Sequence, residues 1–371
     1  MGVTSLKPGI ATTIQDAGRT GFLGSGFSPS GVMDARAHKI ANLLLDNKPN
    51  APVLEFCLAG PKLRFTTNTF IAITGGNFCP MLNGKPVSMY TAVAVKRGSV
   101  LSFGSPVQGV WGYLAIAGGS IRVPEVMGST STNIKCGIGG WKGRTLITGD
   151  YLPFVTHNVD FIANLGSHKV SSDEEFYGWG KECVTLRVIP GPQENMFTQN
   201  GTKTFYTQTY TTTSRCDRMG YRLDGPVVET KNGSDIISDG IALGAVQIPA
   251  EGKPIIMLAD RQTTGGYAKI GTVCSVDIPK LVQCRTGQKI CFKEISVQEA
   301  QDLYVDEQRY MASLAKKVKR PSLGGMSPRK TARRLTPILQ AQAKLNKNQS
   351  LWIKRKHNPI IENSESKAVG E

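Results

Sequence analysis

The sequence lacks the features of a membrane-spanning or secreted protein. None of its apolar runs approaches the ~20 residues that a transmembrane helix needs. The amino-terminal stretch MGVTSLKPGIATT has no basic region followed by an apolar core, so we expect no secretory signal. We therefore expect a cytoplasmic protein that does not bind membranes.

The sequence also lacks a metal-binding pattern. Its four histidines are scattered, and none of its eight cysteines forms a C-x-x-C pair. Most of the cysteines lie within strand-like apolar runs, so we expect them to be small buried hydrophobic residues in a reducing compartment. Neither a metal site nor a disulfide framework is expected.

The positive charge is concentrated at the carboxyl terminus. The formal net charge is +16, and from residue 301 onward 15 Lys and Arg stand against 6 Asp and Glu. Beyond Pro321 the composition predicts a largely disordered basic tail. Such a tail can contact phosphates, but no aromatic interleaving or base-reading motif accompanies the charge. We therefore favour a solvated appendage over a nucleic-acid partner.

Short β-rich runs separated by turns dominate the rest of the chain. They include TFIAIT at 69–74, WGYLAIA at 111–117, TLRVI at 185–189 and PIIMLA at 254–259. No regular helical pattern separates these runs, so barrels or sandwiches fit better than a parallel sheet of βαβ units. Asn83-Gly84 is a strong signal for a hairpin turn.

Two segments have the apolar spacing of a helix. One is MDARAHKIANLLLDN, from Met33 to Asn47. The other begins at Ser296, which forms a capping-box pattern with Glu299. The stretch 168–182 between the β-rich halves has no core-forming pattern. We expect a first β unit at 1–178, a second at 179–295, and a carboxyl-terminal helix with the basic tail at 296–371.

Polar residues gather where a core strand ends. In LADRQTTGGY the apolar strand is followed by five consecutive polar residues, Asp260 to Thr264, and then by a glycine pair. A simple turn would instead use a Pro, Asn or Gly dipeptide. Guanidinium groups, amides, hydroxyls and backbone N–H groups at glycine-rich turns are the donors that stabilise negative charge developing on oxygen.

Motifs of this kind resemble the biotin-dependent carboxyltransferase family, also called allophanate hydrolase subunit 2. Its bacterial members form the C subunit of the ATP-dependent 5-oxoprolinase. The resemblance runs in order from about residue 8 to about residue 293. The motifs that carry it are TTIQDAGRTGF, SGVMD, ANLLLDN, LEF, YLAIAGG, GSTST, GGWKGR, GDYLPF, DRMGYRLDGP, SDGIALGAVQIP and GKPIIMLADRQTTGGYAKIGTV.

The resemblance implies a mainly β fold with two cyclophilin-like β-barrel units and a few short helices. It also implies a complex with a companion carboxyltransferase-like protein, the B subunit, and with a third protein, the A subunit. The implied reaction is ATP-dependent opening of 5-oxoproline to glutamate. The chain has no P-loop, no dinucleotide-binding glycine motif and no Met-Lys-Met segment of the kind that carries biotin. ATP, and biotin if it is used, are therefore expected from a partner.

Two alternatives remain open. One is a biotin-dependent carboxyltransferase that acts on urea or a similar amide. The other is a non-catalytic regulatory subunit that binds a companion carboxyltransferase-like protein. The chain departs from the family pattern at Trp111 and Thr130, where relatives usually have Arg, and each change removes a guanidinium group.

Candidate site residues follow from the resemblance and from their chemistry. Arg261 is suited to clamp a carboxylate, Asp260 to orient it or act as a base, and Tyr267 to wall a pocket. The structural alternative is a buried polar network that joins the two barrels. The expected catalytic residues are Asp260, Arg261, Gln262, Asp217 and Arg218. The expected substrate-binding residues are Arg222, Gln247, Thr263, Thr264, Gly265, Gly266, Tyr267, Gln15, Asp16 and Arg19.

Overall fold

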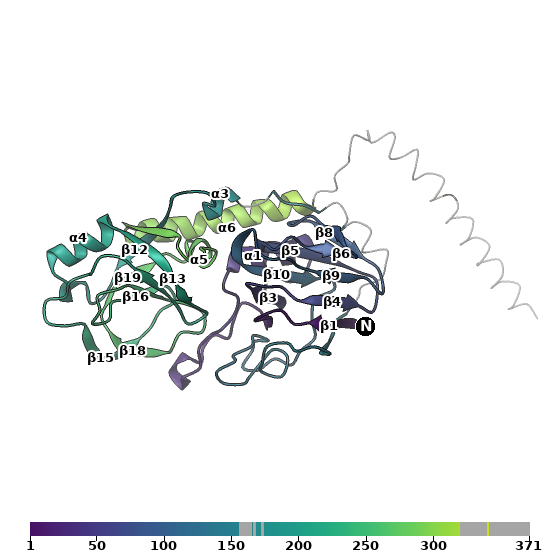
Figure 1. The fold of residues 1–371 in the computed structure, drawn as a ribbon, viewed down its shortest axis with the longest axis horizontal. Coiled ribbons are helices and arrows are strands. Elements are labelled where there is room, and N and C mark those ends of the chain that lie inside the picture. The colour runs from purple at the N-terminus through teal and green to yellow at the C-terminus, as the bar shows by residue number, and fades with distance from the viewer. Residues whose placement is uncertain (156–164, 166–167, 172–173, 320–339, 341–371) are drawn as a thin grey trace, which may run out of the picture. The chain divides into compact units, whose positions relative to one another are not determined.

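The structure is a computed structural model that describes residues 1–155, 165, 168–171, 174–319 and 340 (Figure 1). Met1–Arg320 form one compact unit, which we call the first unit. The expected disordered tail lies outside the described residues, apart from residue 340. All features below belong to the first unit, and no helix in the described part of the chain is long and apolar enough to cross a membrane.

Two antiparallel sheets form the amino-terminal half, which we call the N-terminal lobe. Their orders are β11-β1-β4-β9-β6-β7 and β2-β3-β10-β5-β8. Side chains from both sheets, such as Phe65 and Leu114, meet in one buried cluster. The strands are β1 Gly2–Lys7, β2 Thr13–Gln15, β3 Val53–Cys57, β4 Lys62–Phe65, β5 Thr69–Asn77, β6 Met81–Leu82, β7 Lys85–Pro86, β8 Ala92–Val95, β9 Val100–Ser102, β10 Gln108–Ile116 and β11 Tyr151–Pro153.

The second half closes into a seven-stranded barrel in the order β12-β19-β16-β17-β14-β13-β20. The parallel pair β12–β20 completes the ring, and β15 and β18 form a separate two-stranded ribbon. The mainly β fold class is thereby confirmed. The strands are β12 Cys183–Pro190, β13 Thr209–Cys216, β14 Gly220–Asp224, β15 Asp235–Gly240, β16 Ala245–Gln247, β17 Ile255–Met257, β18 Thr264–Tyr267, β19 Lys269–Val273 and β20 Lys289–Glu294.

A disulfide joins Cys183 and Cys291 across the β12–β20 pair. The expectation that the chain holds no disulfide is therefore wrong. The two cysteines lie 108 residues apart in sequence, and only the parallel pairing of the first and last barrel strands brings them together. Cys79 and Cys136 are exposed, so the expectation that the cysteines are buried is wrong for these two as well.

Both expected helices are present. The first is α1, Ala35–Leu44, and Asp34 caps it by accepting a hydrogen bond from the Ala37 amide. The second is α6, Val297–Lys319, which begins with the Ser296–Glu299 capping box. Asn83 and Gly84 adopt positive φ values between β6 and β7, as the hairpin signal predicts. The other helices are η1 Leu23–Ser25, α3 Glu174–Tyr177, η3 Glu194–Met196, α4 Gln199–Thr207 and α5 Ile278–Val282.

A buried polar network ties the N-terminal lobe to the barrel. Gln283, just after α5, accepts hydrogen bonds from the amides of Val110 and Trp111 and donates to Asp34. Tyr177 also donates to Asp34 and is only 1% exposed. Although 168–182 has no core-forming pattern in sequence, its Tyr177 is buried where the two halves meet. The division at residue 178 stays a prediction.

Trp111 fills part of the same junction. Its indole nitrogen donates to the Tyr221 hydroxyl at 3.2 Å, and Tyr221 donates in turn to the Val282 carbonyl. The side chain is buried in the core that runs from α1 into the barrel. Trp111 therefore holds the two halves together.

Candidate functional site

Arg218 and Asp260 form the centre of a charged cluster between the two halves. Strands β14 and β17 pair side by side, so the loop before β14 and the loop after β17 lie together. Backbone bonds continue the alignment, because the Asp260 amide donates to the Arg218 carbonyl at 2.8 Å. The guanidinium of Arg218 then donates to both Asp260 oxygens, at 2.7 and 3.1 Å. The two expected Asp-Arg segments therefore meet.

Arg218 also reaches across to the N-terminal lobe. It forms an ion pair with Glu55 of β3 and donates to the Gly31 carbonyl at 2.7 Å. Burial alone would lower the pKa of Arg218, but Glu55 and Asp260 raise it above its ordinary value. Burial raises the pKa of Glu55. The charge of Arg218 and the hydrogen bond from the Met33 amide act in the opposite direction. The arrangement is a carboxylate–guanidinium–carboxylate bridge between strand β3 and the turn after β17.

Asp16 organises a neighbouring loop. Its carboxylate accepts hydrogen bonds from the hydroxyls of Ser129, Thr130 and Ser131 and from the amides of Thr130 and Gly18. Burial would raise the pKa of Asp16, but these hydrogen bonds lower it overall. Thr130 is thus one of the groups that hold this carboxylate.

Arg19 is a buried cation with incomplete hydrogen bonding. Its side chain is 1% exposed, and Nη2 donates to the Ser131 carbonyl at 2.6 Å. Nε and Nη1 have no hydrogen-bond partner among the described residues. Burial lowers the pKa of Arg19, and the charges of Asp16 and Asp260 oppose this. A Cβ at Gly139 would collide with the Ser131 carbonyl and lie 2.9 Å from Arg19 Nη2, so glycine lets this loop close over the guanidinium.

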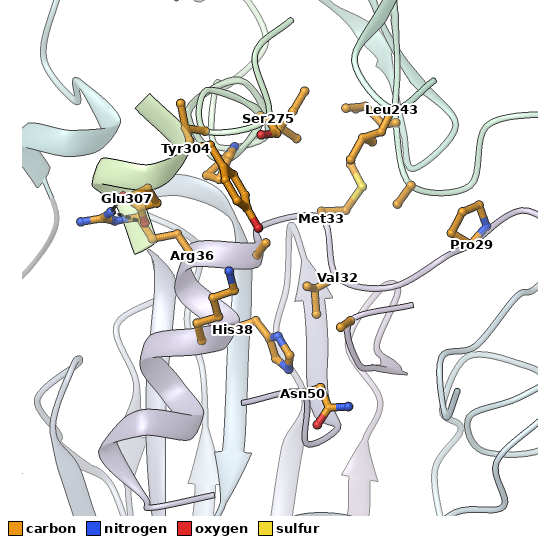
Figure 2. Close-up of a pocket in the computed structure, with 18 of the residues that line it drawn as sticks. Pro29, Val32, Met33, Arg36, His38, Asn50, Leu243, Ser275, Tyr304 and Glu307 are labelled. Atoms are coloured by element: carbon orange, nitrogen blue, oxygen red, sulfur yellow. Dashed lines mark hydrogen bonds and ion pairs between the residues drawn. The ribbon is translucent and has the colours of Figure 1, made fainter. Parts of the chain in front are cut away.

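A cavity of about 380 Å³ lies between α1, the barrel and α6 (Figure 2). Arg261 forms part of its wall and is only 5% exposed. Its guanidinium donates to the carbonyls of Ile241 and Leu258, at 2.9 and 3.1 Å, and among the described residues no carboxylate pairs with it. Burial lowers its pKa. An uncompensated buried cation at a cavity wall is suited to bind an anion.

Apolar and cationic side chains make up most of the remaining wall. Lys39 extends the positive side, the buried His38 lies beside it, and Arg36 is neutralised by Glu307. Burial lowers the pKa of His38. The apolar lining consists of Val32, Met33, Phe176, Leu243, Leu258, Val276, Ile278 and Pro279, with Ala17, Pro29, Ala35, Pro49 and Ala259 beside them.

The structure separates the other expected site residues. Gln262 is exposed, and Thr264 to Tyr267 form β18 of the ribbon, so Tyr267 is not among the residues that line this cavity. The expected wall position of Tyr267 is therefore not met, because the chain turns away from the cavity directly after Arg261. Thr263 is half-buried. Its carbonyl accepts a hydrogen bond from the Ile241 amide at 3.0 Å.

Three further candidates, Asp217, Arg222 and Gln15, lie away from this cavity. Asp217 accepts hydrogen bonds from the amides of Met219 and Gly220 and so shapes the turn before β14. Arg222 is exposed on β14. Gln15 is buried in β2 and donates to the Thr132 carbonyl. None of these three lines the cavity around Arg261.

Gln247 is buried in β16, and its Nε2 has no partner among the described residues. A Cβ at Gly265 would lie 3.0 Å from this nitrogen, and Gly266 follows in the same half-buried strand. The glycine at position 265 therefore allows close packing of the ribbon against the barrel.

Glu55 was not anticipated from the sequence. The signal was available, because a glutamate inside the apolar run VLEFC must be buried and therefore paired. Arg36, Glu307 and Tyr304 were also missed, since contact between α1 and α6 joins residues more than 260 positions apart. Within the described residues, no three His, Cys, Asp or Glu side chains gather as metal ligands.

Comparison with known proteins gives a family match and similar proteins that agree with one another. Residues 25–294 match the family described as carboxyltransferase domain, subdomain A and B. The chain is 38% identical to the C subunit of 5-oxoprolinase from Escherichia coli K12, over 84% of this chain and 96% of the relative. It is 34% identical to the corresponding C subunit from Haemophilus influenzae, over 80% of this chain and 94% of the relative.

Longer proteins contain a similar region. The crystal structure of Kluyveromyces lactis urea carboxylase matches with a TM-score of 0.76 at 28% identity, over 89% of this chain and 30% of that one. The K. lactis urea amidolyase structure matches with a TM-score of 0.75 at 29% identity, over 89% of this chain and 20% of that one. By fold and by sequence, the chain belongs to the carboxyltransferase domain family, subdomains A and B.

Proposed function

We propose that this chain is part of a 5-oxoprolinase-type complex that converts 5-oxoproline to glutamate with ATP. The proposal draws on the similarity to two 5-oxoprolinase C subunits over almost their whole lengths. The chain acts only together with two partners, a companion carboxyltransferase-like B subunit, and a third protein, the A subunit. We further propose that it works in the cytoplasm.

The observation that carries the proposal is Arg261 in the cavity wall. 5-Oxoproline is a small cyclic amide with one carboxylate. A buried guanidinium without a carboxylate partner would take up that carboxylate with its free hydrogen-bonding capacity. The apolar side chains opposite would contact the methylene groups of the ring. The cavity is large enough to leave room for a second reactant or a residue from one of the companion subunits.

The charged cluster would position Arg261. Both oxygens of Asp260 accept hydrogen bonds from Arg218, which holds the carboxylate in one orientation. We propose that Asp260, which directly precedes Arg261, fixes the place of Arg261 through its bonds to Arg218, and that Arg19 supports the loop beside it; neither Asp260 nor Arg19 lines the cavity. The remaining candidates, Asp217, Arg222, Gln247, Gln262, Thr263, Thr264, Gly265, Gly266, Tyr267, Gln15 and Asp16, would support this site or the companion interface.

We propose that neither ATP nor biotin is bound by this chain alone. The sequence has no P-loop and no biotin-carrying Met-Lys-Met segment. We therefore assign nucleotide binding, and any biotin, to the companion proteins of the complex.

Reconstitution tests the proposal. The chain and its two companion subunits are mixed with ATP and 5-oxoproline, and glutamate is measured. Arg261→Met should reduce kcat/KM by at least 100-fold, and Arg261→Lys by less, because Lys keeps the charge but not the paired donors. Co-elution of the three subunits should be unchanged. Absence of glutamate with the wild-type chain would reject the proposal.

Urea carboxylation is the second candidate. The chain is 30% identical to Saccharomyces cerevisiae urea amidolyase over 91% of its own length, although it spans only 19% of that protein. In this case a biotinylated partner would supply the carboxylate. Transfer of labelled bicarbonate to urea, without glutamate formation, selects this function over the first.

A further inference from the structure

Helix α6 lies beyond the residues matched by the family and forms one wall of the cavity. The family match ends at residue 294, whereas α6 begins at Val297. A clamp holds the helix against α1: Arg36 donates to both oxygens of Glu307, at 2.6 and 2.5 Å. The Arg36 guanidinium also lies 4.0 Å from the Phe176 ring centre and 4.5 Å from that of Tyr310. This clamp fixes the place of α6 relative to the cavity.

A second hollow lies along α6 beside the cavity. It has a volume of about 610 Å³ and is lined by the barrel residues Ile189 and Val273 and by Val297, Ala300 and Val305 of α6. We call it the α6 groove. Leu243, Ser275 and Tyr304 line both the groove and the cavity, so these three residues form the mouth between them.

Tyr304 is the polar aromatic residue at this mouth. Its side chain is 51% exposed, and among the described residues its hydroxyl has no hydrogen-bond partner. Figure 2 shows the ring extending from α6 with the hydroxyl directed into the cavity. The buried tyrosines Tyr177 and Tyr221 differ, because each of their hydroxyls donates within the protein. Tyr304 therefore keeps both its donor and its acceptor capacity for a ligand.

We propose that Tyr304 is a specificity-determining residue that contacts the ligand at the mouth of the cavity. The inference rests on the proposed function and adds to it the source of amide recognition. Arg261 holds the carboxylate, and the Tyr304 hydroxyl makes a hydrogen bond with the amide group as the ring of the substrate lies between them. The phenol ring also narrows the passage from the α6 groove. A site with such a polar contact rejects an analogue that lacks the amide.

Two probes of similar size separate these roles. 5-Oxoproline has both a carboxylate and an amide, whereas cyclopentanecarboxylate has only the carboxylate. Their equilibrium binding to the assembled complex is measured by competition with radiolabelled 5-oxoproline or by calorimetry. Tyr304→Phe keeps the ring and should weaken the binding of 5-oxoproline about 2- to 10-fold, which is the effect of losing one neutral hydrogen bond. It should leave the binding of cyclopentanecarboxylate unchanged, while Arg261→Met should weaken the binding of both probes.

Matched controls distinguish the mouth from the rest of the surface. Tyr151→Phe removes a hydroxyl from the exposed Tyr151 of β11 and should alter neither probe. Leu243→Trp enlarges a mouth residue and should weaken the binding of both probes, whereas Ile147→Trp enlarges another partly exposed residue outside the mouth and should not.

The outcomes separate the inference from the proposed function. Three results would overturn the role of Tyr304. Tyr304→Phe could weaken the binding of both probes equally, or it could weaken the binding of neither. The wild-type complex could also bind neither probe. Amide-selective weakening in a complex that forms no glutamate would keep the role of Tyr304 and reject only the reaction.

Discussion

Arg218 binds both oxygens of Asp260 and, with another nitrogen of the same guanidinium, the carboxylate of Glu55. One side chain thus joins the barrel to the N-terminal lobe through two acidic partners, and Glu55 is fully buried. Such a bridge fixes geometry more than it adds stability, because the desolvation of three charges offsets their attraction. Removing only the central charge, however, leaves two carboxylates close together.

Arg218→Met should therefore destabilise the protein by about 3–5 kcal/mol, since it leaves Glu55 buried without its cation. Urea denaturation followed by tryptophan fluorescence measures this loss. The double variant Arg218→Met, Glu55→Gln should recover part of it, because the uncompensated charge is gone. Equal stability of Arg218→Met and the wild-type protein would contradict the bridge.

The loop around residues 129–131 depends on Asp16. Asp16→Ala removes the acceptor for three hydroxyls and two amides and should cost about 3 kcal/mol of stability. Asp16→Asn keeps one carbonyl acceptor and should cost less. Hydrogen exchange of the Thr130 amide should rise in both variants, more strongly in the first. Unchanged protection of that amide in Asp16→Ala would show that other contacts hold the loop.

Asp34 should make stability depend on pH. Burial raises the pKa of Asp34 from 3.8 to about 6, against opposing hydrogen bonds from Ala37, Gln283 and Tyr177. Between these two values the folded protein binds the proton more tightly than the unfolded chain. The contribution of Asp34 is therefore fully present below pH 3.8 and is lost as pH rises through about 6.

The difference in unfolding free energy between wild type and Asp34→Asn isolates this contribution. It should fall by roughly 3 kcal/mol as pH rises from about 4 to about 7. Tyr177→Phe, which keeps the carboxylate but removes one donor, should shift the pH midpoint upward. A difference that stays flat across this pH range would rule out a raised pKa for Asp34 in the folded protein.

The disulfide between Cys183 and Cys291 should stabilise the barrel. It spans 108 residues, and closing a loop of that length in the unfolded chain corresponds to a stabilisation of about 2–5 kcal/mol. The variant Cys183→Ala, Cys291→Ala should lose this amount. Dithiothreitol should lower the stability of the wild-type protein equally and leave the variant unaffected; a variant that stays sensitive to dithiothreitol would point to a different cysteine pair.

The sequence predicted what local patterns determine. Periodic apolar residues identify α1 and α6, the Ser296–Glu299 spacing marks a helix start, and Asn83-Gly84 marks a hairpin. The β-rich character follows from short runs with turns between them. Each of these features depends on residues within a few positions of one another, so one sequence suffices to find it.

The site could be predicted only in part, because it depends on distant contacts. Asp260 and Arg261 are neighbours and were expected to act together, yet the turn after β17 sends Asp260 to Arg218 and Arg261 to the cavity wall. The Arg218–Glu55 pair spans 163 positions in sequence. No spacing rule reaches that far. A buried glutamate signals that a cation is needed, but it does not say which one.

The closing pair of the barrel has a consequence during protein synthesis. Strand β12 is paired on one side by β20, which ends at Glu294. While the ribosome is still adding those last residues, the nascent barrel has two free strand edges with unpaired backbone groups. Such edges invite pairing with other chains. Yields from recombinant expression should therefore fall sharply for any fragment truncated before β20, and chaperones that cover strand edges should improve the recovery of the full chain.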